Sequence, residues 1–228
     1  MQSAVARITK PAPTGVAPEQ RLVLDNVAWK DYETIGKALS DRPALRLTYD
    51  RGRLEIMTTS FEHERRKCLL GRLIDVLSEE FDVPIGAAGS TTFKKRGLKR
   101  GLEGDQTYYT KNLARVQGKK RLELEKDPAP DLAMEIDATR SSVNRMAIYA
   151  RLKVAELWRY DGVTIRVFLL DQSGNYQEVS ASPTFPGIPI QELVRFLHLA
   201  ETKDDNTVVR EFRAWVRKHL PKKRRKSK

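Results

Sequence analysis

The chain has 228 residues, of which 40% are hydrophobic and 32% are charged. This composition predicts one folded domain with appendages and excludes an intrinsically disordered chain. The single cysteine, Cys68, excludes an intramolecular disulfide framework and a cysteine-based zinc cluster. No apolar run reaches the length of a membrane span, and residues 1–20 lack the apolar core of a secretory signal, so we expect a cytoplasmic protein without a membrane partner.

Positive charge is concentrated in two segments. The formal net charge is +12, and residues 217–228 contribute eight Lys or Arg and no acid, which leaves +4 for the remainder. A second cluster holds five cations within seven residues: Lys94, Lys95, Arg96, Lys99 and Arg100. Both clusters favour a polyanionic partner such as nucleic acid. The tail taken alone is typical of a solvated chain end.

The first part of the chain contains a hairpin pattern. Residues 1–20 include three prolines and no periodic pattern, which predicts a flexible N-terminal arm. A short helix is predicted over 31–40. Two runs with alternating apolar positions, 44–49 and 53–58, flank the turn residues 50–52, so we expect a β-hairpin there.

The clearest helix is predicted over residues 59–81. Its leucine, isoleucine and phenylalanine side chains recur at helical spacing on one face. Thr59 and Glu62 fit a capping box at its start, with Ser60 as the rival cap.

The remaining segments alternate between strands and helices. Strands are predicted over 91–93, 105–110, 131–137, 155–160, 163–170 and 176–179. Helices are predicted over 141–152, capped by Ser141 or Ser142, and over 190–199 and 207–220. The polar residues 111–130 predict a loop or a partly helical excursion. This order predicts an α/β domain over 21–200 with a mixed central sheet flanked by helices, followed by a C-terminal helix and basic tail over 201–228.

Two acidic residues stand in unusual positions. Glu135 lies inside the apolar strand Leu-Ala-Met-Glu-Ile-Asp, where a carboxylate is costly to bury unless it is paired or binds a metal. Asp105 begins another strand, and neighbouring strands lie about 4.8 Å apart, so both acids could meet across one Mg²⁺. Asp137 shares the face of Glu135 at about 7 Å along the strand, whereas Asp131 is about 13 Å away and too far to share the ion.

Several segments together resemble a known family. They are EHE at 62–64, GSTTF at 89–93, GLEGD at 101–105, PDLAMEID at 130–137, NR at 144–145 with Tyr149, and AELW at 155–158. In order and spacing, residues 45–170 resemble the Uma-two family of endonucleases, a branch of the PD-(D/E)XK nuclease superfamily. The resemblance implies a restriction endonuclease-like core with a four-stranded mixed sheet.

The resemblance also implies roles for individual residues. Asp105 matches the first metal-binding Asp and Glu135 the acid of the second half-motif, with the carbonyl of Ile136 as a further ligand. Glu62 and His63, which open the long helix, are weaker candidates beside the site. The chain departs from the family in two places, because Gly104 replaces a frequent Pro and Asp137 stands where the superfamily has Lys. Relatives often carry a basic residue on the following helix, which matches Arg145.

These residues predict an endonuclease that hydrolyses the phosphodiester bonds of nucleic acid with the help of Mg²⁺, or of Mn²⁺ as the alternative ion. DNA is favoured over RNA as the substrate. Asp137 is expected to bind a second ion or to orient water. Arg145 or a lysine of the 94–100 loop is expected to neutralise phosphate charge. The basic loop and tail are expected to hold nucleic acid without reading its sequence. A homodimer is expected because enzymes that cut both strands usually pair two sites.

Other interpretations stay open at this stage. Glu135 can be a satisfied core carboxylate paired with Arg145. The whole domain can be a catalytically decayed nuclease fold that acts as a nucleic-acid-binding module, an interpretation that Asp137 at the lysine position supports. The domain can also be a structural or interaction protein that has this fold as a scaffold and no catalytic activity.

Overall fold

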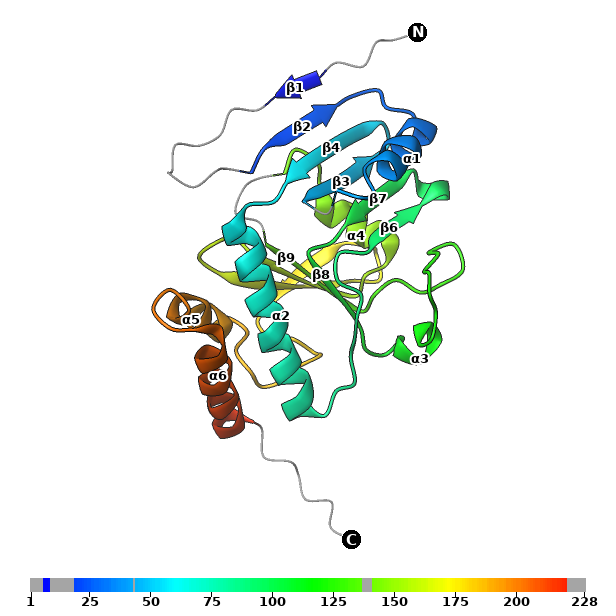
Figure 1. The fold of residues 1–228 in the computed structure, drawn as a ribbon. Coiled ribbons are helices and arrows are strands. Elements are labelled where there is room, and N and C mark those ends of the chain that lie inside the picture. The colour runs from blue at the N-terminus through cyan, green and yellow to red at the C-terminus, as the bar shows by residue number, and fades with distance from the viewer. Residues whose placement is uncertain (1–5, 9–18, 43, 137–140, 221–228) are drawn as a thin grey trace.

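The computed structural model describes residues 6–8, 19–42, 44–136 and 141–220, whose strands form two six-stranded sheets (Figure 1). The first sheet is antiparallel throughout. In spatial order it contains β1 (Ala6–Ile8), β2 (Arg21–Leu24), β4 (Arg53–Thr58), β3 (Leu45–Asp50), β7 (Arg100–Glu103) and β6 (Thr92–Lys95). The chain passes from this sheet to the second one at Gly104 and Asp105.

The second sheet is mixed. In spatial order it contains β12 (Tyr176–Val179), β11 (Ile165–Leu170), β10 (Glu156–Tyr160), β9 (Leu132–Ile136), β8 (Gln106–Tyr109) and β5 (Gly86–Ala87). Strands β9 and β10 are parallel, and the other neighbours are antiparallel. Parallel neighbours need a crossover, which the segment containing α4 supplies. The expected α/β fold with a mixed sheet is confirmed, and strands β8 to β11 form its four-stranded core.

Helices cover both faces of the second sheet. The described helices are α1 (Trp29–Ala38), α2 (Phe61–Phe81), α3 (Leu113–Val116), α4 (Arg145–Leu152), α5 (Glu192–Leu199) and α6 (Asp205–His219), with a 3-10 turn at Arg96–Leu98. The helices α2, α5 and α6 pack on one face, and α4 packs on the other. None of the helices in the described part of the chain is long and apolar enough to cross a membrane.

Burial on both faces explains why β9 is almost continuously apolar. Leu132, Met134 and Ile136 point to the cluster that contains α2, whereas Ala133 points to the cluster that contains α4. The alternation leaves Glu135 on the α4 side of the sheet. A carboxylate therefore lies inside a strand that is buried at every position.

Local chemistry explains the predicted hairpin and helix. Arg51 and Gly52 both have positive φ, 47° and 104°, as a two-residue turn between antiparallel strands requires. The helix α2 begins after Ser60, whose side chain accepts from the backbone N–H of His63 at 3.1 Å. The rival cap is therefore correct, and the capping box with Thr59 and Glu62 is wrong.

Two further expectations from the sequence are corrected. The basic segment is a hairpin formed by β6 and β7, although no strand was expected at 100–103. The helix α4 begins later than expected, with Asn144 as its cap. Ser141 and Ser142 do not cap it because both side chains turn to other partners, described below.

The helix α6 belongs to the main core, which yields a first prediction. Phe212 is fully buried and packs edge-on against Phe196 of α5, with ring centroids 4.9 Å apart. We expect Phe212→Ala to lower the free energy of unfolding by about 3 to 5 kcal/mol, measured by urea denaturation. Phe61→Ala is the matched control, because Phe61 is 82% exposed and its loss should change stability by less than about 0.5 kcal/mol. Equal effects of the two substitutions would contradict this packing.

Candidate active site

Asp105 and Glu135 lie side by side where the two sheets join. Gln106 of β8 pairs with Met134 of β9, so the antiparallel register continues to Asp105 opposite Glu135. The backbone N–H of Ile136 donates to Asp105 Oδ2 at 2.8 Å. Both acids are buried, with exposed fractions of 3% and 5%. Residues far apart in the chain thus place two carboxylates in one buried location.

Asp105 is paired with a histidine from the first turn of α2. His63 Nε2 lies 3.0 Å from Asp105 Oδ1, and His63 Nδ1 lies 2.9 Å from Glu19 Oε1. Both acceptors are carboxylates, so each ring nitrogen carries a proton and the ring is an imidazolium. Burial lowers the pKa of His63, but the hydrogen bonds to Asp105 and Glu19 outweigh burial and raise that pKa to about 9.

The histidine in turn controls the ionisation of Asp105. Burial raises the pKa of Asp105, yet the hydrogen bond and positive charge of His63 outweigh it and leave that pKa below its usual value. His63 is therefore a cationic partner that keeps Asp105 ionised. It is not a free base at neutral pH.

Glu135 is paired with two residues of α4. Arg145 donates to both carboxylate oxygens, from Nε to Oε2 at 2.7 Å and from a terminal nitrogen to Oε1 at 2.9 Å. The hydroxyl of Tyr149 donates to Oε1 as well. Burial raises the pKa of Glu135, Arg145 opposes this rise, and the charge of Asp105 adds to it. With three donors around it, Glu135 is held as an acceptor in a fixed orientation.

Arg145 connects the acidic pair to the first sheet. Its other hydrogen bonds go to Thr48 Oγ1 of β3 at 2.6 Å and to the carbonyl oxygen of Glu103 in β7 at 2.8 Å. The guanidinium is thus committed to protein acceptors on three sides. The pairing of Glu135 with Arg145, which the sequence left open, is present.

Close packing explains the glycine before Asp105. A Cβ atom at Gly104 would lie 2.6 Å from the hydroxyl oxygen of Tyr149 and 2.9 Å from Cγ2 of Thr107. Real Cβ atoms do not approach other atoms so closely. The departure from the frequent Pro therefore follows from the position of Tyr149 against Glu135.

One comparison with known proteins now identifies the family. A family model described as "Uma2: Putative restriction endonuclease" matches residues 29–200. The chain belongs to the Uma2 family. The resemblance found in the sequence is confirmed, and the match extends from α1 to α5 around the acidic pair. No curated protein is similar enough to match the chain.

The nuclease family implies a divalent cation, and the acidic pair is the place where the described residues could hold one. A cavity of about 10 Å³, roughly the space of one water molecule, lies beside the acidic pair. Its lining combines acids with three arginines: Asp105, Glu135, Glu103, Ile136, Met57, Arg21, Arg46 and Arg145. The described part of the chain places no group of three or more His, Cys, Asp or Glu for a metal. Mg²⁺ keeps several waters and often takes only one or two carboxylates. The two carboxylates match the number that Mg²⁺ often takes, but a cavity with the volume of one water admits a hydrated ion only if the surrounding side chains move apart.

Another predicted site residue, Glu62, lies apart from the acidic pair. Asp137 lies outside the described residues. Glu62 is exposed and its Oε1 lies 2.5 Å from Arg66, so it forms an ion pair on the surface of α2 and does not contact Asp105. Of the two residues proposed at the start of this helix, only His63 contacts the candidate site, and sequence reasoning ranked it too low.

The basic hairpin extends away from the acids. Lys94 and Arg96 lie 3.4 Å and 2.8 Å from the carboxylate of Glu33 in α1, so Lys94 does not extend over the acidic pair. The hydrogen bond from Arg96 lowers the pKa of Glu33. Between Arg100 and Asp105 the chain covers about 16 Å, because β7 is extended. The tip of the hairpin therefore lies a strand's length from the candidate site.

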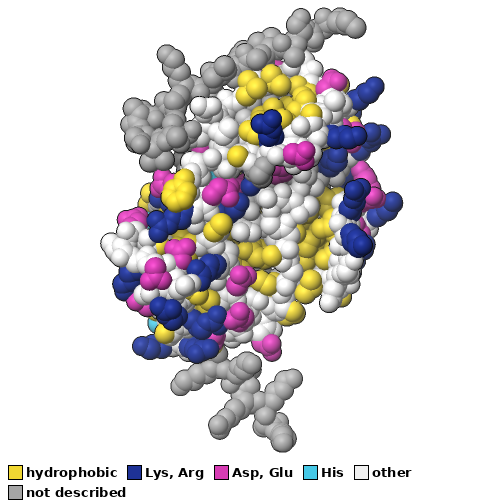
Figure 2. All heavy atoms as spheres, in the orientation of Figure 1, with side chains coloured by type: hydrophobic (Ala, Val, Ile, Leu, Met, Phe, Trp, Pro, Cys, Tyr) yellow, Lys and Arg dark blue, Asp and Glu magenta, His cyan; other side chains and the backbone are white. Residues whose placement is uncertain are grey.

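The members of the basic hairpin also differ in exposure. Lys94, Arg96 and Lys99 are exposed and Lys95 is half-buried. Arg100 is buried, and its Nε lies 2.9 Å from Asp50 Oδ1. Arg100 is therefore removed from the expected nucleic-acid-binding set. In Figure 2 cationic side chains gather at the upper right, where α1 and β6 lie, and over α5 and α6 at the lower left.

Sequence reasoning missed a second buried glutamate. Glu55 of β4 is 1% exposed and accepts from Arg21, from the hydroxyls of Ser141 and Ser142, and from the backbone N–H of Ser142, at 2.7 to 2.8 Å. Burial raises its pKa, but the bonds from Ser142 and the charge of Arg21 outweigh burial and lower it. Glu55 thus holds the segment that precedes α4. Its signal was a carboxylate inside the apolar strand Arg53–Thr58, the same signal that pointed to Glu135.

The raised pKa of His63 predicts a pH-dependent stability. A pKa of about 9, above the ordinary 6.5, stabilises the fold fully below pH 6.5, and this contribution is lost as the pH rises through 9. We expect the difference in free energy of unfolding between wild type and His63→Gln to shrink by on the order of 3 kcal/mol over this range. Urea denaturation at successive pH values measures it.

The control for this experiment is His198→Gln, because His198 is exposed on α5. Its effect on stability should not change over the same pH range. A difference between wild type and His63→Gln that is constant with pH would show that His63 is not held as an imidazolium.

Proposed function

We propose that the chain is a metal-dependent nuclease that hydrolyses phosphodiester bonds of nucleic acid, with DNA favoured over RNA as the substrate. The observation that carries the proposal is the meeting of Asp105 and Glu135 on neighbouring strands, in a chain of the Uma2 family. Ion pairing alone does not require two acids to be buried beside each other, because their mutual repulsion opposes it. A shared cation accounts for the arrangement.

The proposed ligands are Asp105, Glu135 and the backbone carbonyl of Ile136, for Mg²⁺ or Mn²⁺. When bound, the ion lowers the pKa of a water molecule and stabilises negative charge on the phosphate. The protein groups orient these ligands. His63 and the N–H of Ile136 hold the two oxygens of Asp105, and Arg145 holds both oxygens of Glu135.

Charge near the acids supports the same role. Arg145 offsets the charge of Glu135 and is part of the cationic side of the site. Asp137 follows two residues after Glu135 and is proposed to orient water or to bind a second ion. Nucleic acid is proposed to contact the exposed hairpin cations Lys94, Arg96 and Lys99, the half-buried Lys95 and the basic tail, without reading of sequence. Pairing of two copies stays a prediction.

One observation favours a second candidate function. Arg145 and Tyr149 supply three hydrogen bonds to Glu135, which leaves this carboxylate satisfied without an ion. This is the arrangement expected of a decayed nuclease fold that binds nucleic acid without cutting it. The two functions differ in whether a divalent ion enables cleavage.

Cleavage of supercoiled plasmid in Mg²⁺ tests the proposal. We expect the wild type to nick or linearise the plasmid and EDTA to abolish the reaction. Asp105→Asn and Glu135→Gln should each lower the rate by roughly 100-fold or more, since each removes an oxygen ligand worth several kcal/mol in the transition state. These substitutions keep the size of the side chain.

Glu178→Gln is the matched control, because Glu178 is an exposed carboxylate on the edge strand β12 of the same sheet. It should cut like the wild type, and thermal melting should show that all variants are folded. Plasmid binding without any Mg²⁺-dependent cleavage by the wild type would replace the nuclease with the non-catalytic binding module.

A further inference from the structure

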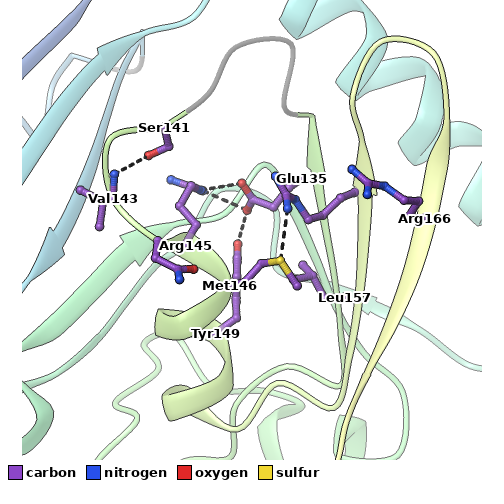
Figure 3. A pocket seen from close by; sticks show the side chains of 10 residues that line it. Glu135, Ser141, Val143, Arg145, Met146, Tyr149, Leu157 and Arg166 are labelled. Atoms are coloured by element: carbon purple, nitrogen blue, oxygen red, sulfur yellow. Dashed lines mark hydrogen bonds and ion pairs between the residues drawn. The ribbon is translucent and has the colours of Figure 1, made fainter. Parts of the chain in front are cut away.

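The pocket beside Glu135, with a volume of about 360 Å³, holds cations that already have protein partners (Figure 3). The figure shows Arg145 directed at the carboxylate of Glu135. Arg159 donates to the sulfur of Met146 at 3.2 Å, and Arg166 forms an ion pair over 3.6 Å. The arginines of this pocket are therefore held by the protein around the acidic pair.

A larger groove lies where β5, β6 and α3 meet. Its volume is about 880 Å³, within the range of ligand pockets. The strands β5 and β6 each end one of the two sheets, and residues of the segment 117–123 after α3 form another wall. Figure 2 shows hydrophobic side chains between β6 and α3, with Lys or Arg side chains beside them at the right edge of the molecule. The groove thus combines an apolar floor with a cationic rim.

The floor of the groove is aliphatic. Leu113, Val116 and Leu122 line it and are half-buried, and Ala87 and Ala88 extend it. Unstacked bases can lie against apolar side chains, whereas a duplex keeps the faces of its bases stacked on one another. The floor therefore suits single-stranded nucleic acid better than a duplex.

The rim carries accessible cations. Lys119, Lys120 and Arg121 line the groove and are exposed. Lys119 forms an ion pair with a nearby aspartate, but within the part of the chain that the structure describes Lys120 and Arg121 form no ion pair. The acid in the lining, Glu123, is itself neutralised by Lys126 at 2.9 Å. An anionic ligand therefore meets two cations that no described carboxylate occupies.

The basic hairpin lies beside this rim. The backbone N–H of Arg96 donates to Oε1 of Glu125 at 2.9 Å, and Leu98 and Leu122 pack against the same buried cluster, which contains Phe93. Two cationic segments that are separate in the sequence thus meet on one surface. Such a concentration of positive charge favours a polyanion over a ligand with a single carboxylate.

One hydrogen bond links the groove to the acidic pair. Thr92 lines the groove, and its hydroxyl donates to Oε1 of Glu103 at 3.1 Å. Glu103 in turn lines the small cavity beside Asp105 and Glu135. A nucleic-acid strand bound at the acidic pair can therefore continue into the groove.

We propose that the groove binds a single-stranded extension of the nucleic-acid substrate, with bases on the aliphatic floor and phosphates at Lys120 and Arg121. The proposal rests on the proposed nuclease function and names its substrate class, a nucleic acid with an unpaired arm next to the cleaved bond. The groove carries no base specificity, because contacts to phosphates and to base faces are common to all bases. The basic segment 217–228 of the chain is an unsuitable occupant, because its charge has the same sign as the rim.

Binding of a fluorescein-labelled oligothymidylate, measured by anisotropy in EDTA, tests the groove separately from cleavage. We expect Lys120→Ala/Arg121→Ala to weaken this binding by roughly three- to tenfold and to reduce the slope of log affinity against log salt by about 1 to 2. The same variant should lose less affinity for a blunt DNA duplex, because the duplex does not enter the groove.

Val116→Thr tests the floor. It keeps the shape of the side chain but adds a hydroxyl to the apolar surface, so oligothymidylate should bind roughly two- to fourfold more weakly with an unchanged salt slope. Thermal melting should show that this variant is folded.

Arg151→Ala/Lys218→Ala is the matched control for the rim. It removes two exposed cations, from α4 and α6, that lie outside the groove, and should bind oligothymidylate nearly like the wild type. The proposal is overturned if both double variants weaken oligothymidylate binding equally, or if Lys120→Ala/Arg121→Ala binds it like the wild type. It is equally overturned if a labelled peptide of alternating Glu and Leu depends on Lys120 and Arg121 while oligothymidylate does not, since the groove would then take a protein partner.

The two proposals can fail independently. If the wild type cuts plasmid and Lys120→Ala/Arg121→Ala binds and cuts a duplex with a single-stranded arm equally well, the groove is wrongly assigned and the nuclease stands. If the wild type never cuts but the double variant binds oligothymidylate more weakly with a smaller salt slope, the groove stands on a non-catalytic binding module.

Discussion

Two carboxylates buried side by side are the constraint on which the centre of this protein depends. Taking Asp105 and Glu135 out of water is costly, and their proximity adds repulsion. Each is offset by its own cation, His63 for Asp105 and Arg145 for Glu135. The two cations come from α2 and α4, which lie on opposite faces of the second sheet. The acidic pair therefore fixes how both helices sit against the strands.

The same ion pairs connect the two sheets. His63 also contacts Glu19, Arg21 lies between Glu19 and Glu55, and Glu55 holds the serines before α4. Arg145 at the start of that helix then returns to Glu135. The charges alternate in sign along this path, so each buried group has an opposite neighbour. Removing one member leaves its partner buried and unpaired, which is why such networks hold a site rigidly.

Cations in this protein fall into groups with different physical roles. Arg100 is buried and Arg145 is half-buried, and both neutralise acids, whereas the exposed hairpin residues lie a strand's length away from the acidic pair. Arg159 and Arg166 line the pocket beside Glu135. The proposed nuclease function uses this division, because nucleic acid needs accessible charge on the surface as well as a rigid set of ligands at the acidic pair.

Sequence patterns determined the elements whose signal is local. The hairpin at residues 44–58, the long helix α2 and the strand around Glu135 follow from apolar periodicity and turn residues, and the family follows from ordered short motifs.

Tertiary structure decided which side chains are partners. His63 meets Asp105 across 42 residues, and Glu55 meets Ser142 across 87, so no local pattern contains either contact. It likewise decided that Ser60 and Asn144 are the caps, and that Arg159 faces Arg166. Periodicity reports which side of an element is buried, but the groups that meet inside depend on how distant strands are registered.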